Sequence, residues 1–90
     1  MPITVRIPTS LRRFTGGKAE ASAQGRTVAQ VIDDLERNYP GLRDSLLDSQ
    51  GVRRFVNLYV GEDDIRFLNG LDTELAAGNV LTILPGIAGG

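Results

Sequence analysis

One long stretch of this chain has the apolar spacing of a helix, and strand-like stretches lie on both sides of it. Its apolar residues recur with a helical period of about 3.6 and form one stripe: Val28, Val31, Ile32, Leu35 and Tyr39. Thr27 is a suitable N-cap residue, and Gln30 three residues later completes a capping box. Pro40 and Gly41 end the helix. Because an apolar stripe must be covered, this helix must pack against another element of the fold.

The strand-like segments come before and after the helix. Five segments are predicted as strands, in this order: 3–7, 18–23, 55–60, 65–67 and 79–84. The first alternates apolar and polar residues, the second is a weak edge strand in a hairpin with the first, and 55–60 has the strongest strand propensity. Pro8 and Pro85 end the first and last strands because proline has no N–H to donate. Short helical turns are expected at 42–47 and 71–75, with a loop at 48–51.

The order of these elements predicts an α+β domain. Two hairpin strands precede the helix, and three strands follow it. Val56, Leu58 and Val60 should face the helix, as should Leu81 and Ile83 of the last strand. We expect the last strand to lie beside the first, in parallel, in the middle of a mixed sheet. This is a β-grasp (ubiquitin-like) arrangement, with the domain at 1–85 and a flexible Gly-Gly tail at 86–90.

Composition excludes several classes of function. The 90 residues fit one domain, and the net charge of −1 gives no general attraction to nucleic acid. No apolar run approaches the roughly 18 residues of a membrane span, and the first residues do not resemble a secretion signal, so we expect a cytoplasmic location. The chain has no Cys and no His. It therefore lacks thiol nucleophiles, the usual zinc ligands and the commonest general base, and we expect no bound cofactor or metal.

Other polar and aromatic clusters have ordinary interpretations. Glu62-Asp63-Asp64 fits a solvated turn better than a metal site, because consecutive residues cannot easily converge on one ion. We interpret the basic pairs Arg12-Arg13 and Arg53-Arg54 first as solvated surface residues. The second interpretation is that they contact a partner, because exposed arginine is enriched in interfaces. Phe55 and Tyr59 are weighed equally as core or contact residues, since aromatic side chains serve both roles.

The C-terminal residues offer a different chemistry. Gly89 and Gly90 lack side chains and end in a carboxylate, which is ionised at neutral pH. A strip this thin fits a narrow enzyme channel. Most chain ends are simply frayed, but here the last predicted strand leads directly into the glycines. The nearby apolar residues Leu84, Pro85 and Ile87 form a candidate docking surface, from which Ala88 leads into the partner's site.

With these features noted, the chain resembles the ubiquitin-like sulfur carriers of the MoaD/ThiS superfamily, most of all those of the CysO type, which serve cysteine biosynthesis. The resemblance covers nearly the whole chain. It rests on these segments: Ile7-Pro8-Thr9 with Leu11-Arg12, Thr15-Gly16-Gly17, Arg54-Phe55-Val56-Asn57 with Tyr59-Val60, Glu62-Asp63 with Arg66-Phe67, and Ile83-Leu84-Pro85 with Ala88-Gly89-Gly90. The Gly-Gly end is shared by the superfamily, and the other segments point to the CysO type.

The resemblance implies a carrier that does no catalysis itself. An E1-like, MoeB-type activating enzyme uses ATP to adenylate the carboxylate of Gly90, which then becomes a thiocarboxylate. A PLP-dependent cysteine synthase accepts the sulfur, and a metalloprotease releases the new cysteine. ATP and PLP belong to these partners. We expect the carrier to be monomeric and to bind neither nucleic acid nor membranes.

Three alternatives remain open at this point. The chain could be a small subunit of molybdopterin synthase or a thiamine-pathway carrier, with the same chemistry and a different acceptor. It could be a protein modifier that joins Gly90 to lysines of target proteins. It could also be a plain interaction domain with an incidental Gly-Gly end. The intact mass of the modified chain distinguishes the chemical classes.

Overall fold

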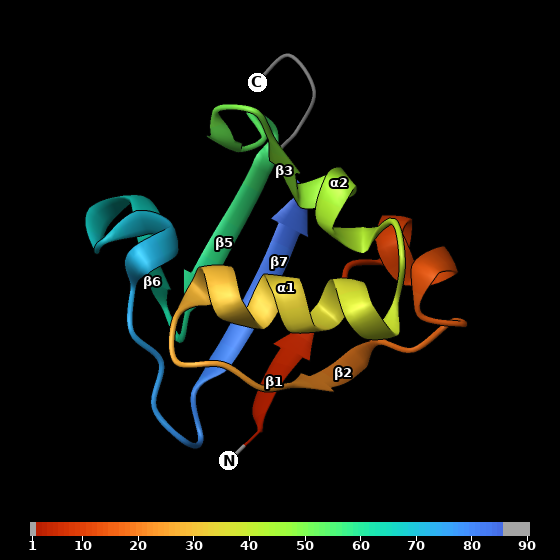
Figure 1. Ribbon diagram of the computed structural model, residues 1–90, viewed down its shortest axis with the longest axis horizontal. Helices are drawn as coiled ribbons and strands as arrows, with labels where there is room; N and C mark the ends of the chain where they lie inside the picture. Colours follow the sequence, from red (N-terminus) through yellow and green to blue (C-terminus); the bar gives the residue numbers. More distant parts are fainter. Residues whose placement is uncertain (1, 86–90) are drawn as a thin grey trace.

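The fold is a mixed sheet crossed on one face by a single main helix, α1 (Val28–Asn38) (Figure 1). It is seen in a computed structural model that describes residues 2–85. Five strands form the sheet within these residues: β1 (Ile3–Arg6), β2 (Glu20–Ala23), β5 (Val56–Val60), β6 (Asp63–Asp64) and β7 (Val80–Pro85). Their order is β2-β1-β7-β5-β6, and β7 runs parallel to β1 while the other neighbours are antiparallel. The predicted β-grasp arrangement, with the last strand central and parallel to the first, is confirmed.

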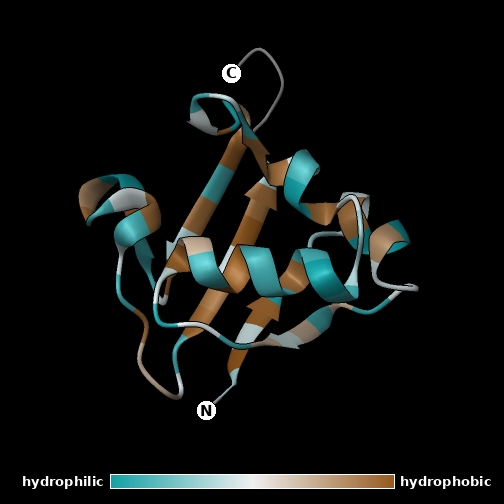
Figure 2. Ribbon diagram, viewed as in Figure 1, coloured by the Kyte–Doolittle hydropathy of each residue, from teal (hydrophilic) through white to brown (hydrophobic). Residues whose placement is uncertain are grey.

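The core lies between α1 and the sheet. The helix contributes Val28, Val31, Ile32 and Leu35, all fully buried. The sheet contributes alternate residues of its strands: Ile3, Val5, Leu58, Leu81 and Ile83. In Figure 2 the outward side of α1 is largely hydrophilic, while the strands behind it are mostly hydrophobic. Since each buried aliphatic side chain stabilises the fold by roughly 1.5–3 kcal/mol, the alternation seen in the sequence decides which face of each strand is covered.

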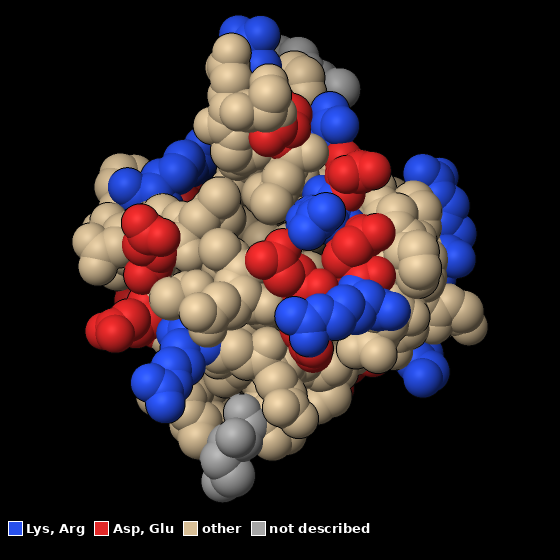
Figure 3. All heavy atoms as spheres, in the orientation of Figure 1, with Lys and Arg blue, Asp and Glu red and all other residues tan. Residues whose placement is uncertain are grey.

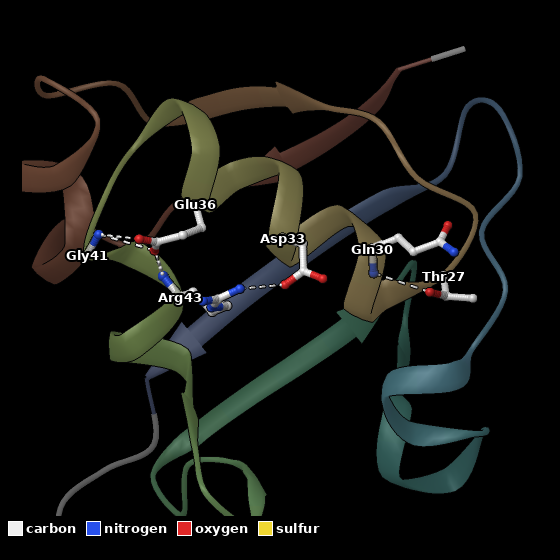
Figure 4. A network of polar contacts seen from close by, with 6 residues as sticks. All are labelled: Thr27, Gln30, Asp33, Glu36, Gly41 and Arg43. Carbon is white, nitrogen blue, oxygen red and sulfur yellow. Dashed lines mark hydrogen bonds and ion pairs between the residues drawn. The ribbon is translucent and has the colours of Figure 1, made fainter.

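Polar contacts fix both ends of α1 (Figure 4). At its start, the Gln30 N–H donates to Thr27 Oγ1 at 3.2 Å, as predicted. The Gln30 side chain accepts from the N–H of Arg26 at 2.8 Å, so the reciprocal half of the capping box is shifted by one residue. At the other end, the Glu36 carboxylate accepts from the N–H of Gly41 at 3.1 Å and from that of Arg43 at 2.9 Å. This carboxylate joins α1 to the short helix α2 (Leu42–Leu46).

The segment after α2 contains a hairpin that sequence reasoning missed. It consists of β3 (Leu47–Asp48) and β4 (Gly51–Val52), where a helical end at Leu47 and a loop at 48–51 were predicted. The turn is stabilised by Asp48 Oδ1, which accepts from the N–H of Gln50 at 2.8 Å. Gly51 has a φ of +117°, in the region that favours glycine. Two-residue strands are too short to give an alternating pattern, so the sequence shows only a turn.

The prediction of a strand at 65–67 is wrong. These residues form a 3-10 helix, η2 (Ile65–Phe67), and the strand β6 comes just before it. The Asp64 side chain caps η2 by accepting from the N–H of Arg66 at 2.9 Å, which favours a turn over an extended chain. The predicted helical turn at 71–75 is shorter and begins earlier, as η3 (Gly70–Asp72). The expected loop after Pro8 contains η1 (Thr9–Phe14), and its Leu11 and Phe14 pack against the core as anticipated.

The described residues end with β7. Pro85 pairs with Val56 and is the last residue of the strand, so the strand runs one residue further than predicted. Proline is tolerated at this position because the missing N–H falls at the end of the ladder. The expected tail at 86–90 lies outside the described residues. Across residues 2–85, no helix combines the length and the apolar character that a membrane span requires.

Candidate functional site

Strand β7 positions the candidate site at the end of the sheet. It lies between β1 and β5, so it is hydrogen-bonded on both sides. In this register Thr82 is opposite Arg6 on one side and Tyr59 on the other, and Leu84 is opposite Asn57. A strand paired on both edges is held more rigidly than an edge strand. The described residues therefore end on an interior strand of the sheet.

The structure separates the apolar residues of β7 into two sets. Leu81 and Ile83 are buried under α1, while Leu84 is 45% exposed and points to the opposite face of the sheet. Pro85 is also exposed. These orientations are as predicted, and a role of Leu84 and Pro85 in partner binding stays a prediction. The other proposed site residues lie outside the described residues: Ile87, Ala88, Gly89 and Gly90.

Leu84 belongs to a surface on the sheet face opposite α1, which we call the outer-face patch. It consists of Asn57, Tyr59, Arg66, Thr82 and Leu84. Asn57 lies opposite Leu84 and Tyr59 opposite Thr82, so these four side chains share one face of adjacent strands. Arg66 reaches the patch from η2 and donates from Nη2 to Asn57 Oδ1 at 2.6 Å. The patch thus combines an exposed leucine with a positioned cation.

A nearly buried carboxylate holds Arg66 in place. Asp64 is only 7% exposed, and its Oδ2 accepts from Nη2 of Arg66 at 2.7 Å and from Nε at 3.2 Å. The hydrogen bonds from the Arg66 side chain and from its backbone N–H lower the pKa of Asp64. The pair also raises the pKa of Arg66. Asp64 was predicted to be a solvated turn residue, and this is wrong because β6 turns its side chain under the guanidinium.

Sequence reasoning did not identify Arg66 as a site residue. It appeared only within the Glu62-Asp63, Arg66-Phe67 segment of the family resemblance. The contact between Arg66 and Asn57 depends on how β5 and β6 pair, which spacing along the chain does not reveal. The Asp64-x-Arg66 spacing, at the start of a turn, is the local signal that could have suggested the pair.

Three arginines of the two basic pairs make contacts within the fold, and a role in partner binding stays a prediction. Arg12 Nε donates to the carbonyl of Ile7 at 3.1 Å, and the Arg13 guanidinium lies 4.9 Å from the centre of the Phe14 ring. These arginines therefore have structural contacts besides solvent. Arg53 likewise donates from Nε to the Asp44 carbonyl at 2.7 Å.

Phe55, which directly precedes β5, and Tyr59, within β5, lie outside the buried core. Phe55 is 52% exposed, and Tyr59 is half-buried on the outer face. A shallow groove lies at the ends of β1 and β7. Its lining includes Arg6, Pro8 and Leu84. Leu84 therefore lines this groove and also belongs to the outer-face patch.

The helical side of the molecule has a different character. Acidic and basic side chains alternate over α1 and α2 (Figure 3), and several are engaged within the fold. Arg43 Nη1 donates to Asp33 Oδ1 at 2.9 Å, and Asp34 accepts from the N–H of Gln24 at 2.9 Å. Within residues 2–85, no three acidic, His or Cys side chains stand close enough to share a metal ion. We find no catalytic constellation on this face among the described residues.

The comparisons with known proteins assign the family. A model of the ThiS family matches residues 5–90. This chain belongs to the ThiS family. It is 50% identical to the sulfur carrier protein CysO of Mycobacterium tuberculosis (strain ATCC 25618 / H37Rv), over an alignment that covers 100% of both chains. The fold of this ThiS-family chain also matches a chain in the crystal structure of the Amycolatopsis orientalis BexX/CysO complex. That match has a TM-score of 0.92 and 45% identity, and it covers 98% of this chain and 99% of the other.

A more distant relative has a different name. The small archaeal modifier protein 3 of Haloferax volcanii is 33% identical, over an alignment that covers 100% of both chains. The relatives of this chain therefore include proteins named as sulfur carriers and a protein named as a modifier. Both kinds match this chain from end to end.

Proposed function

We propose that this chain is a sulfur carrier protein that serves cysteine biosynthesis. Its reactive group is the carboxylate of Gly90, and the β-grasp domain presents that group to enzymes. The chain acts as a cosubstrate, and its partners supply the catalytic groups and the ATP. This assignment fits a sequence with no Cys and no His.

The proposed chemistry has two steps. A carboxylate oxygen of Gly90 attacks the α-phosphorus of ATP, pyrophosphate leaves, and an acyl-adenylate forms. Hydrosulfide, or sulfur delivered at the same oxidation level, then attacks the acyl carbon and expels AMP, which leaves a thiocarboxylate. Adenylation is needed because a carboxylate is a poor electrophile and lacks a leaving group. The glycines Gly89 and Gly90 suit this chemistry because no side chain obstructs the carboxylate.

The observation that carries the proposal is the full-length match to a sulfur carrier protein. The family match extends to residue 90, so it includes Gly89 and Gly90. The 50% identity to CysO supports the carrier class and the cysteine pathway over a different acceptor. The position of β7 is consistent with this role, since the strand leads from the centre of the sheet to the proposed reactive residues.

Truncation tests the reactive group directly. We expect a chain without Gly89 and Gly90 to support no ATP–pyrophosphate exchange with the activating enzyme of the same organism. The core residues that the structure describes all lie between Ile3 and Ile83, so the truncated chain should melt at nearly the same temperature. Normal exchange by the truncated, folded chain would exclude Gly90 as the reactive residue.

The acceptor is tested by mass. The thiocarboxylate form, mixed with a PLP-dependent cysteine synthase and O-phosphoserine, should be converted to a chain that is heavier than the unmodified carboxylate form by one cysteine residue at Gly90. A metalloprotease should remove this residue. Support of molybdopterin or thiamine formation, without this adduct, would assign the chain to the corresponding pathway instead.

A further candidate function is that of a protein modifier. It is favoured by the 33% identity to small archaeal modifier protein 3. A modifier would give a ladder of conjugates in which Gly90 is joined to lysines of other proteins. Intact-mass analysis of the chain recovered from cells distinguishes the two: a carrier yields a thiocarboxylate or a cysteinyl adduct on an otherwise free chain.

A further inference from the structure

Arg66 is fixed by more contacts than an exposed arginine usually has. Its side chain donates to both carboxylate oxygens of Asp64 and to Asn57 Oδ1. All of these bonds come from Nε and Nη2. The structure shows no bond from Nη1 to any of residues 2–85, although the side chain is 63% exposed. Arg66 therefore keeps two N–H donors for another molecule, in a fixed direction.

The Asp64–Arg66 pair differs from the other close ion pair of the described residues. Arg43 and Asp33 are joined at 2.9 Å, but both side chains are about half exposed, at 45% and 52%. Asp64 is 8% exposed in its side chain and lies under Arg66. Exposed charged side chains usually lose conformational entropy when an ion pair holds them in one geometry. Arg66 is already ordered, so a partner that binds it loses little side-chain freedom.

The position of Arg66 connects it to the proposed reactive end. Its anchor Asn57 is directly opposite Leu84, which is followed only by Pro85 before residue 86. Leu84 and Arg66 thus offer an apolar contact and a cation on adjoining parts of one face. Gly90 is only five residues beyond Pro85, so an enzyme that acts on Gly90 can reach the surface around the end of β7. The outer-face patch is continuous with that surface.

We propose that Arg66 is a specificity residue, which binds a carboxylate side chain of the activating enzyme from Nη1 while Leu84 packs beside it. This inference rests on the proposed function. A carboxylate oxygen can accept a charge-assisted hydrogen bond from Nη1, and the carboxylate carries one negative charge. A phosphate is a poorer match here, because its second charge would lie close to the Asp64 carboxylate. Asp64 and Asn57 are positioning residues, which hold the guanidinium toward the enzyme.

The test is steady-state ATP–pyrophosphate exchange with the activating enzyme of the same organism. Arg66→Gln should raise the KM for the carrier by at least about tenfold, as expected when one member of a close interfacial charge pair is removed. The maximal rate at saturating carrier should be unchanged, because Arg66 is not one of the groups that react in the proposed chemistry. The KM for ATP should also be unchanged. A rise in the KM for ATP would indicate nucleotide binding and overturn the proposal.

Matched variants separate recognition from folding. Arg43→Gln removes the other close arginine–aspartate pair, on the helical side of the molecule, and should leave the KM for the carrier within twofold. Asn57→Ala keeps the ion pair but removes one anchor, and should raise this KM less than Arg66→Gln does. Arg66→Lys keeps the positive charge but lacks the planar guanidinium group with its several N–H donors. It should give an intermediate KM with a stronger dependence on salt.

The outcomes distinguish the two proposals. If the wild-type chain supports no exchange, the proposed function fails and this inference fails with it. If the wild-type chain is active and folded Arg66→Gln has an unchanged KM, only the inference fails. If Arg66→Gln does not fold at the assay temperature, Arg66→Lys and Asn57→Ala decide, and an unchanged KM in both overturns the inference.

Discussion

At the scale of single residues, Ile83 and Leu84 show how strand alternation divides two functions. They are neighbours in β7, yet Ile83 is 1% exposed and Leu84 is 45% exposed. Ile83 packs in the core cluster, whereas Leu84 faces away from α1. The same hydrophobic character therefore stabilises the fold at one position and remains available to a partner at the next.

Substitutions at these two positions should affect different properties: partner binding at Leu84 and the stability of the fold at Ile83. Leu84→Asp should weaken the complex with the activating enzyme by about 1 kcal/mol or more, as for a central interface residue, and change the melting temperature little. Ile83→Ala should instead reduce the free energy of unfolding by roughly 2–5 kcal/mol. Titration calorimetry and urea unfolding measure the two effects. A large loss of stability in Leu84→Asp with unchanged binding would place Leu84 in the core.

Gly41 is a second residue whose conformation is specific. Its φ is +99°, and a Cβ there would lie 2.9 Å from Cε1 of Phe14, which packs against the core. We expect Gly41→Ala to reduce the free energy of unfolding by about 1–3 kcal/mol, from backbone strain and steric overlap together. Gly16→Ala is the control, because Gly16 also has a positive φ, +68°, but a Cβ there meets nothing within 4 Å. Equal losses in urea unfolding would show that the overlap with Phe14 contributes nothing.

At the scale of elements, the junction of α1 with α2 depends on one carboxylate. The backbone N–H groups of Gly41 and Arg43 donate to Glu36 and lower its pKa below the usual 4.5. Because the folded-state pKa is the lower one, the charge on Glu36 contributes stability above pH 4.5, and this contribution is lost as the pH falls through the lowered value.

Glu36→Gln tests this linkage. The variant should be less stable than the wild type at neutral pH, and the difference should shrink below about pH 4.5, the ordinary pKa of the group. Urea unfolding between pH 7 and pH 3 gives the comparison. A difference that stays constant over this range would mean that the charge of Glu36 does not stabilise the junction.

The elements also show what the sequence could and could not predict. Helix α1 and strands β1, β5 and β7 were predictable because several buried residues repeat with a clear period. The 3-10 helix η2 was not, since Ile65 to Phe67 has the composition of a strand and only the cap from Asp64 turns it. The same limit applies to the site. The outward side of Leu84 followed from alternation, but the Arg66–Asn57 contact requires the register of β5 with β6.

At the scale of the whole molecule, the proposed function requires contacts that form and dissociate. A carrier that visits an activating enzyme, a synthase and a protease in turn needs a small, shared surface. We therefore predict that the purified chain is a monomer of 9.7 kDa, measured by light scattering after size exclusion, over micromolar concentrations. A dimer that buries the outer-face patch would contradict both this prediction and the proposed access of enzymes to Leu84.

The central place of β7 has a mechanical consequence. A pull on the chain beyond Pro85 acts along the strand, against the ladders with β1 and β5 on its two sides. Such a load is shared by many hydrogen bonds sheared together, whereas an edge hairpin would open one bond at a time. The residues that enzymes would bind, beyond Pro85, thus follow a strand that resists mechanical unfolding. In a single-molecule force experiment, a chain pulled between residue 2 and residue 85 should resist more strongly than one pulled between β5 and β6.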